Sequence, residues 1–288
     1  MVQATPDAQP APAVAHNAGT VRNAIDETFE RLRAVGRLAF MPYLTAGYPD
    51  RDASLDLGEI YGAHGADLIE LGVPFSDPLG DGPTIQRSSS GALAGGMTTR
   101  KALTLAADLT DRTGKPLVVM GYYNPIVAYG PDRFCADASA AGGRALIVPD
   151  MPLEEADELE AACRVHDMHL IHLLAPTSTE ARLTAVAARA SGFIYCMAVT
   201  GVTGARTELS ADLGPFLARV RAHTDVPLIV GFGISRPEHL TALRALGSAD
   251  GAVVASALVD LVDATPPAER AAVIGAYIER MSAACSAS

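Results

Sequence analysis

The stretch AFMPYLTAGYPDRDASLDLGEIYGAHGADLIELG, residues 39–72, contains one complete repeat unit of this chain. Two short, continuous apolar runs, Ala39–Leu44 and Leu68–Gly72, flank an amphipathic segment at 53–64. Continuous apolar strands that alternate with helices are typical of parallel sheets, because such sheets are covered on both faces. The stretch therefore predicts a strand–helix–strand unit.

The same alternation continues along the chain and predicts eight strands. The apolar runs are Ala39–Leu44, Leu68–Gly72, Leu117–Met120, Ala145–Val148, Leu170–Leu174, Phe193–Met197, Leu228–Gly231 and Ala252–Ala255. Helices are predicted at 53–64, 99–112, 132–142, 155–166, 179–190, 210–223 and 237–247, and a final helical stretch at about 258–283. Eight units predict an α/β protein with a closed (β/α)8 TIM barrel. An open doubly wound sheet is the alternative, but its GxGxxG fingerprint does not follow the first strand.

The two parts of the chain before the first strand differ in pattern. Between Arg22 and Gly36, apolar residues recur at helical spacing, which predicts an extra N-terminal helix. Residues 1–20 are dominated by Ala and Pro without periodicity, so we expect a disordered tail there. Residues 21–288 are expected to form a single barrel domain.

Composition and charge narrow the class of protein. An apolar share of 49% and a charged share of 19% indicate a globular chain rather than a disordered or coiled-coil one. The net charge of −11 argues against a nucleic-acid partner and against an anionic membrane surface. No apolar run approaches the roughly 18 residues of a membrane span, and no secretion signal is visible. The 4 cysteines form no CxxC pair, which suits reduced thiols and a cytoplasmic location.

The segment after the second strand, LIELGVPFSDPLGDGPTIQ (68–86), carries the candidate chemistry. Glu70 interrupts a buried strand, where a carboxylate is costly unless it is paired, hydrated or protonated. Proline and glycine residues then predict a long loop that brings Asp77 and Asp81 over the C-terminal mouth of the barrel, where barrel enzymes have their active sites. Apolar surroundings would raise the pKa of Glu70 toward that of a proton shuttle. A structural glutamate, held by backbone donors or reaching solvent, is the other interpretation of Glu70 alone.

The stretch ELGVPFSDPLGDGPTIQ closely resembles the signature of the tryptophan synthase α subunit family, usually ELGVPFSDPLADGPxIQ. The resemblance continues through FMPYLTAGYPD (40–50), MGYYNPI (120–126), VPDMPLEE (148–155), TGVTGAR (200–206) and VGFGIS (230–235), and covers about 36–283. It implies a (β/α)8 barrel that cleaves indole-3-glycerol phosphate to indole and glyceraldehyde 3-phosphate in tryptophan biosynthesis. It also implies an α2β2 complex, in which indole passes to a β subunit that holds pyridoxal phosphate.

For the chemistry, the resemblance implies that Glu70 is the main acid/base and that Asp81 is hydrogen-bonded to the indole N–H. In this retro-aldol cleavage, the indole C3 gains a proton and the side-chain hydroxyl loses one. Positive charge that develops on the indole nitrogen is stabilised by a carboxylate. The substrate supplies its own electron sink, so we expect neither a metal nor an organic cofactor in this chain.

The resemblance also implies which residues bind the substrate. The indole slot would be lined by Tyr43, Tyr122 and Phe232, with Leu44, Leu117 and Leu173 nearby. The phosphate site would lie after the last two strands, as barrels commonly arrange it, and would use Gly204, Gly233, Ser235, Ala255 and Ser256.

Other positions are implied to shape the mouth of the barrel. The family usually has Gly-Ser where this chain has Ala255-Ser256, and an alanine fits there if its φ is negative. Thr203 would close the site as a lid residue, and Asp150 would orient neighbouring loops. The Pro74–Asp77 loop and Asn124-Pro125 resemble the face that meets the β subunit.

Alternatives to this function stay open on sequence alone. A stand-alone indole-3-glycerol phosphate lyase that releases free indole for secondary metabolism would use the same residues. A phosphate-sugar isomerase or epimerase barrel would share the phosphate site, and a regulatory module would only activate a partner. In HDMHLIH (166–172), His169 and His172 are predicted to face opposite sides of a strand, which argues against a shared metal ion.

Overall fold

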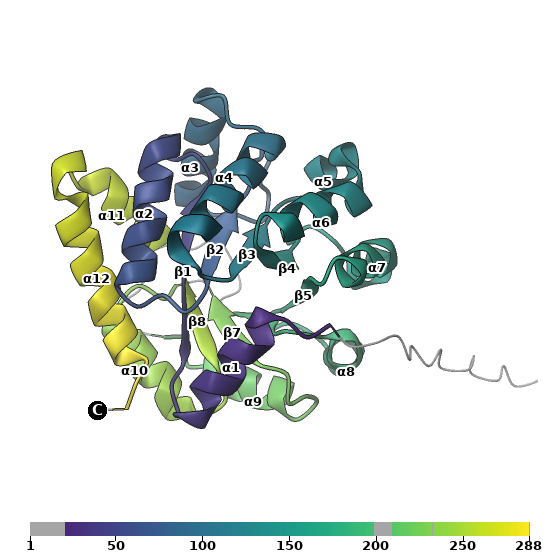
Figure 1. Ribbon diagram of the computed structural model, residues 1–288. Helices are drawn as coiled ribbons and strands as arrows, with labels where there is room; N and C mark the ends of the chain where they lie inside the picture. The colour runs from purple at the N-terminus through teal and green to yellow at the C-terminus, as the bar shows by residue number, and fades with distance from the viewer. Residues whose placement is uncertain (1–20, 199–208, 232, 288) are drawn as a thin grey trace, which may run out of the picture.

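A computed structural model describes residues 21–198, 209–231 and 233–287. Eight parallel strands close into a barrel in chain order, each paired with the next and the last with the first (Figure 1). The strands are β1 (Ala39–Thr45), β2 (Ile69–Gly72), β3 (Leu117–Met120), β4 (Gly143–Ile147), β5 (His169–Leu174), β6 (Ile194–Met197), β7 (Leu228–Gly231) and β8 (Gly251–Val254). The predicted (β/α)8 fold is confirmed, with small shifts at the ends of the strands.

Helices lie around the outside of the strands in Figure 1. The helices are α1 (Ala24–Ala34), α2 (Arg51–Ala63), α3 (Pro83–Ala94), α4 (Thr99–Thr113), α5 (Tyr123–Tyr129), α6 (Pro131–Ala140), α7 (Asp157–Val165), α8 (Glu180–Arg189), α9 (Leu213–Arg221), α10 (Pro237–Leu246), α11 (Ser256–Ala264) and α12 (Arg270–Ala284). Short 3₁₀ turns lie at Leu153–Glu155 and Pro267–Glu269.

Two expectations about helices need correction. The stretch 258–283 is two helices, α11 and α12, because Pro266 and Pro267 lack the N–H groups that a continuous helix needs. Helices α3 and α5 were not predicted. Helix α3 begins at Pro83, and proline is favoured in the first turn because its fixed φ suits a helix.

Side chains of the strands alternate between the barrel interior and the layer beneath the helices. The interior cluster includes Leu68, Val118 and Ile171. The outer cluster includes Ile69 and Leu71. Since successive side chains of a strand point to opposite faces, Glu70 shares the direction of Leu68 and faces the interior.

Helix α1 closes the N-terminal end of the barrel, as the predicted extra helix. Ile25, Phe29 and Leu32 pack into the interior cluster, and the Phe29 ring lies 6.0 Å from that of Phe193. The Asn23 side chain caps the helix and donates to the carbonyl of Arg144 at 2.9 Å. With this end filled by apolar side chains, a ligand can reach the interior only from the opposite end.

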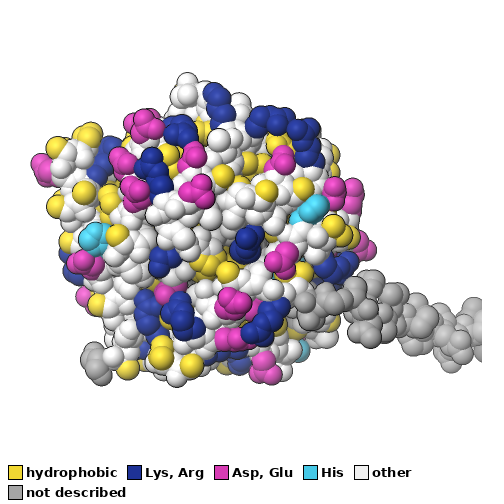
Figure 2. Space-filling model, in the orientation of Figure 1, with side chains coloured by type: hydrophobic (Ala, Val, Ile, Leu, Met, Phe, Trp, Pro, Cys, Tyr) yellow, Lys and Arg dark blue, Asp and Glu magenta, His cyan; other side chains and the backbone are white. Residues whose placement is uncertain are grey.

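The outer surface mixes charges of both signs, as Figure 2 shows for one face. Ion pairs join neighbouring helices there, for example Arg189 on α8 with Glu160 on α7 at 2.8 Å. Within the described ranges, no helix is long and apolar enough to cross a membrane. Residues 1–20, predicted to be a tail, lie outside the described residues.

Candidate active site

Glu70 is the second residue of β2 (Ile69–Gly72), and its side chain is buried inside the barrel. Its side chain is only 4% exposed, and its Oε2 has no hydrogen-bond partner among the described residues. Burial, and then the negative charge of Asp81, raise the pKa of Glu70 to about 8. Glu70 therefore holds a proton at neutral pH.

Asp81 lies in the loop between β2 and α3. Its N–H donates to the Pro78 carbonyl at 3.0 Å, and Gln86 Nε2 donates to the Asp81 carbonyl at 2.9 Å. Burial raises the pKa of the Asp81 carboxyl to about 6, and a hydrogen bond from the Tyr122 hydroxyl acts in the opposite direction. Asp81 is therefore ionised at neutral pH, whereas Glu70 is not.

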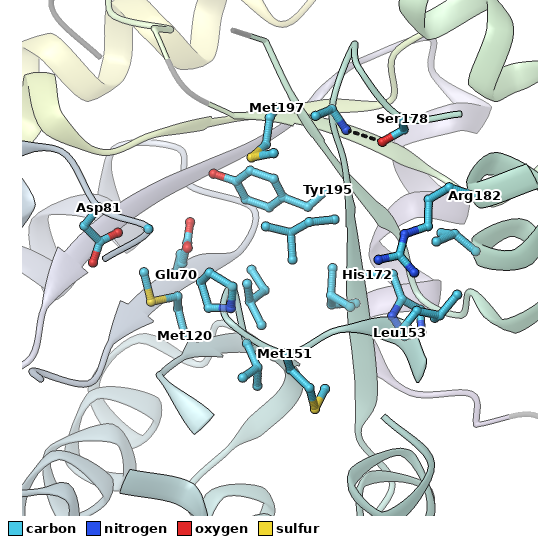
Figure 3. A pocket seen from close by; sticks show the side chains of 18 residues that line it. Glu70, Asp81, Met120, Met151, Leu153, His172, Ser178, Arg182, Tyr195 and Met197 are labelled. Carbon is cyan, nitrogen blue, oxygen red and sulfur yellow. Dashed lines mark hydrogen bonds between the residues drawn. The ribbon is translucent and has the colours of Figure 1, made fainter. Parts of the chain in front are cut away.

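Two cavities meet at these carboxylates. The larger, of about 400 Å³, is lined by both acids and by a mainly apolar wall. In Figure 3, Glu70, Asp81 and Tyr195 lie at one end of this cavity, and His172 and Arg182 lie at the other. The smaller, of about 60 Å³, is also lined by both acids and extends to Ser256. The two acids that the sequence singled out are thus brought together between an apolar space and the ends of β7 and β8.

The two predicted tyrosines lie in different places. Tyr43 lines the smaller cavity. Tyr122 is not among the described residues that line either cavity; its ring stacks on Phe75 at 5.2 Å, and its hydroxyl accepts the Gly80 N–H at 3.1 Å. Tyr122 therefore contacts the loop that carries Asp81 and holds it in place.

The aliphatic residues named for the indole slot lie in two different layers of the barrel. Leu173 lines the larger cavity, but Leu44 and Leu117 belong to the layer beneath the helices, so their prediction is wrong. The reason is the alternation along each strand, which turns these two leucines outward. Met120 and Tyr195 line both cavities but are absent from the sequence prediction. The alternation of side chains along each strand could have identified them, because it turns both toward the interior.

Three of the predicted phosphate-binding residues line the smaller cavity: Gly233, Ala255 and Ser256. Gly233 has φ +85°, which favours glycine, whereas Ala255 has φ −116°, so the negative φ that the sequence required of an alanine here is present. Ser256 begins α11, so unpaired N–H groups of its first turn lie at this end.

Other predicted binding residues lie elsewhere or outside the described part. Ser235 lines neither cavity among the described residues, and its N–H donates to His239 Nδ1 at 3.2 Å. Thr203, Gly204 and Phe232 lie outside the described residues.

Asp150 and the histidines have local partners. Asp150 Oδ1 accepts the Tyr123 N–H at 2.9 Å at the start of α5, so it orients a neighbouring segment as predicted. His169 Nε2 lies 2.8 Å from Asp26 on α1, whereas His172 Nε2 lies 3.0 Å from Glu160 on α7. The two histidines thus face opposite sides of β5, as predicted.

Comparisons with known proteins identify the family of this chain. The family model described as Tryptophan synthase alpha chain matches residues 29–285. A tryptophan synthase alpha chain of Chloroflexus aggregans is 50% identical over 263 residues, which are 91% of this chain and 98% of that protein. One of Roseiflexus sp. is 53% identical over 247 residues, 85% of this chain and 94% of that protein. A structure of Mycobacterium tuberculosis tryptophan synthase superposes with a TM-score of 0.85 at 36% identity, and covers 94% of this chain and 100% of that one. This chain therefore belongs to the tryptophan synthase alpha chain family.

Proposed function

We propose that this protein is the lyase of tryptophan biosynthesis that cleaves indole-3-glycerol phosphate to indole and glyceraldehyde 3-phosphate. The observation that carries the proposal is the pair Glu70 and Asp81. The two acids line the same cavities, yet one is protonated and the other ionised at neutral pH. Such a pair divides the roles of acid and charge stabiliser between two carboxyl groups.

Glu70 can supply both proton transfers of the retro-aldol reaction. Its carboxylic acid first donates a proton to C3 of the indole ring, which leaves a carboxylate. That carboxylate then takes the proton of the hydroxyl on the carbon attached to C3, and the bond between this carbon and C3 breaks. The bonding electrons return to the ring, an aldehyde forms, and Glu70 regains its proton. No net proton enters or leaves.

Asp81 stabilises the charge that this sequence creates. Protonation of C3 makes the ring nitrogen positive, and an ionised carboxylate that accepts its N–H stabilises that state more than the ground state. The neighbouring apolar wall, with Met120 and Leu173, excludes water and strengthens the interaction. No cofactor is required for these steps.

The arrangement of the cavities suits the two ends of the substrate. The larger, apolar cavity has room for an indole ring, and the smaller one extends to Gly233 and Ser256, where a phosphate would meet the first turn of α11. For Ser235 and Gly204 we propose the phosphate role, and for Thr203 the lid role, that the family resemblance implies.

A β subunit that holds pyridoxal phosphate is the proposed partner, in a cytoplasmic α2β2 complex. Asp77 and Leu79 are exposed on the same loop as Asp81, Asn124 is exposed at the start of α5, and Leu79 is 83% exposed. A large apolar side chain on such a loop suits a protein contact. Asp77→Ala should change indole production only when the β subunit is present; an equal change without it would contradict a role at the interface.

The test of the proposed function is the release of indole from indole-3-glycerol phosphate, with and without a β subunit. We expect kcat/KM to rise as Asp81 ionises, near pH 6, and to fall as Glu70 ionises, near pH 8. Absence of indole under both conditions would contradict the function. A rate that keeps rising above pH 8 would contradict Glu70 as the initial acid. Fast turnover without the β subunit would favour a stand-alone lyase, which no observation here supports.

A further inference from the structure

A chain of three buried hydroxyl groups runs from the smaller cavity into α3. Tyr43 Oη lies 3.1 Å from Thr45 Oγ1, which lies 2.7 Å from Ser88 Oγ. Ser88 Oγ in turn donates to the Ile85 carbonyl at 2.9 Å. Tyr43, Thr45 and Ser88 are all buried, so the protein itself determines how these protons are arranged.

The last contact fixes the direction of the chain. A carbonyl can only accept, so Ser88 uses its single proton on Ile85 and must accept from Thr45. Thr45 then uses its proton on Ser88 and must accept from Tyr43. Three protons serve three contacts, whereas any other arrangement leaves one contact without a proton. The hydroxyl proton of Tyr43 therefore points toward Thr45.

The oxygen of Tyr43 is consequently an acceptor on its remaining side. Tyr43 lines the smaller cavity together with Glu70 and Ser256. Burial, and then the negative charge of Asp81, raise the pKa of Tyr43, so the hydroxyl stays neutral. A buried neutral acceptor beside a ligand cavity calls for a donor from the ligand.

We propose that the Tyr43 hydroxyl oxygen accepts a hydrogen bond from the substrate hydroxyl at C2 of the glycerol chain, and that Tyr43 thereby selects substrates that carry it. This inference rests on the proposed function. In that substrate, C2 lies between the carbon that is cleaved from indole, near Glu70, and the phosphate, near Ser256. The hydroxyl on the cleaved carbon gives its proton to Glu70, so the C2 hydroxyl is the donor left in this part of the molecule.

The experiment is a cycle of two proteins and two substrates. Wild type and Tyr43→Phe are assayed with indole-3-glycerol phosphate and with its 2-deoxy analogue; phenylalanine keeps the ring and removes only the oxygen. We expect each single change to lower kcat/KM by about tenfold, the size of one hydrogen bond, and the two together to lower it no further. Losses that multiply would overturn the proposal.

A 2-fluoro analogue tests the direction of the hydrogen bond. Fluorine can accept but cannot donate, so with wild type it should behave like the 2-deoxy compound. A 2-fluoro analogue that recovers most of the rate would mean that Tyr43 donates, and would overturn the proposal. Thr45→Val keeps the shape of the side chain but frees the Tyr43 proton, so it should let the 2-fluoro analogue recover part of the rate while the 2-deoxy compound, which has no acceptor at C2, does not.

The same cycle separates failure of this inference from failure of the proposed function. If wild type releases no indole, the proposed function fails. Calorimetry would then give the dissociation constants of the same compounds. If Tyr43→Phe and the 2-deoxy change remove one shared contact, the two changes together should weaken binding no more than either change alone. If wild type releases indole but the losses multiply, only the role of Tyr43 fails.

Discussion

Two acidic residues only three positions apart, Asp67 and Glu70, have very different surroundings. Asp67, just before the strand, accepts from Arg37 Nη1 at 2.5 Å and from the Phe40 N–H at 3.0 Å. Glu70, within the strand, has an Oε2 without a partner among the described residues. Both side chains are largely buried, with exposed fractions of 9% and 4%. Burial alone therefore does not separate them; their partners do.

The difference shows that one barrel has a structural carboxyl group at its closed end and the proposed catalytic one at its open end. At the end closed by α1, a buried charge is satisfied by an arginine and a backbone donor and helps to hold the chain together. At the open end, a buried carboxyl group whose Oε2 has no hydrogen-bond partner among the described residues keeps its proton, at a cost in stability, and can give that proton to a substrate. If this contrast is right, substitutions at the two ends should affect different measurements.

Glu70→Gln should have the largest effect. The amide keeps the shape of the side chain but cannot transfer a proton, so kcat/KM for indole release should fall by about 10³-fold, within the usual range for a lost acid/base. Circular dichroism should show the same fold as wild type. Activity within a few-fold of wild type would remove Glu70 from the mechanism.

Asp67→Asn should act on stability instead. It leaves the Arg37 guanidinium without its closest anion, and we expect the free energy of unfolding in urea to fall by roughly 2–3 kcal/mol. Indole release by the folded variant should stay close to that of wild type. Unchanged stability, or a loss of kcat without a loss of stability, would contradict a structural role for Asp67.

The pH dependence of stability should also distinguish Glu70. Its pKa of about 8 in the folded protein is above its ordinary value of 4.5, so the folded state binds the proton more tightly than the unfolded state. The free energy of unfolding that this tighter proton binding contributes is fully present below pH 4.5 and is lost as the pH rises through 8. Relative to wild type, Glu70→Gln should be about 4 kcal/mol more stable near pH 9 than it is near pH 5, since wild type alone loses the contribution of this proton. Parallel stability curves would contradict the raised pKa.

Tyr122→Phe should have the smallest effect. It removes the donor to Asp81 and the acceptor of the Gly80 N–H, and the lost hydrogen bonds should lower kcat/KM at neutral pH by about tenfold. Because the hydrogen bond from Tyr122 lowers the pKa of Asp81, the acidic limb of the pH–rate profile should move to higher pH. A lower rate with an unmoved limb would mean that Tyr122 acts on something other than Asp81.

The strands and the two acids could be predicted because their signals are local. Each strand is a short apolar run between turn residues, and Glu70 stands out as a charge inside one of them. The break before α12 has an equally local signal, the pair Pro266 and Pro267, which divides the predicted helical stretch 258–283. Leu44 and Leu117 were placed in the pocket by family likeness without regard to strand parity, which turns them outward.

Long-range contacts could not be predicted in the same way. The hydrogen bond between Thr45 and Ser88 joins residues 43 positions apart, on β1 and α3. The roles of Tyr122 and Tyr43 likewise depend on which loop or cavity their hydroxyls meet. Such contacts are set by how the strands and helices pack, and no spacing in the sequence encodes them directly.

The most direct test of this contrast is the ionisation of the Glu70 carboxyl group itself. Carbon-13 NMR of protein labelled at the glutamate side-chain carboxyls, with Glu70→Gln to assign the resonance, would follow its titration. We predict a midpoint near pH 8 for Glu70, far above the ordinary value of 4.5. A Glu70 carboxyl that is already ionised at pH 6 would show that the open end of the barrel does not hold the proton on which the proposed cleavage depends.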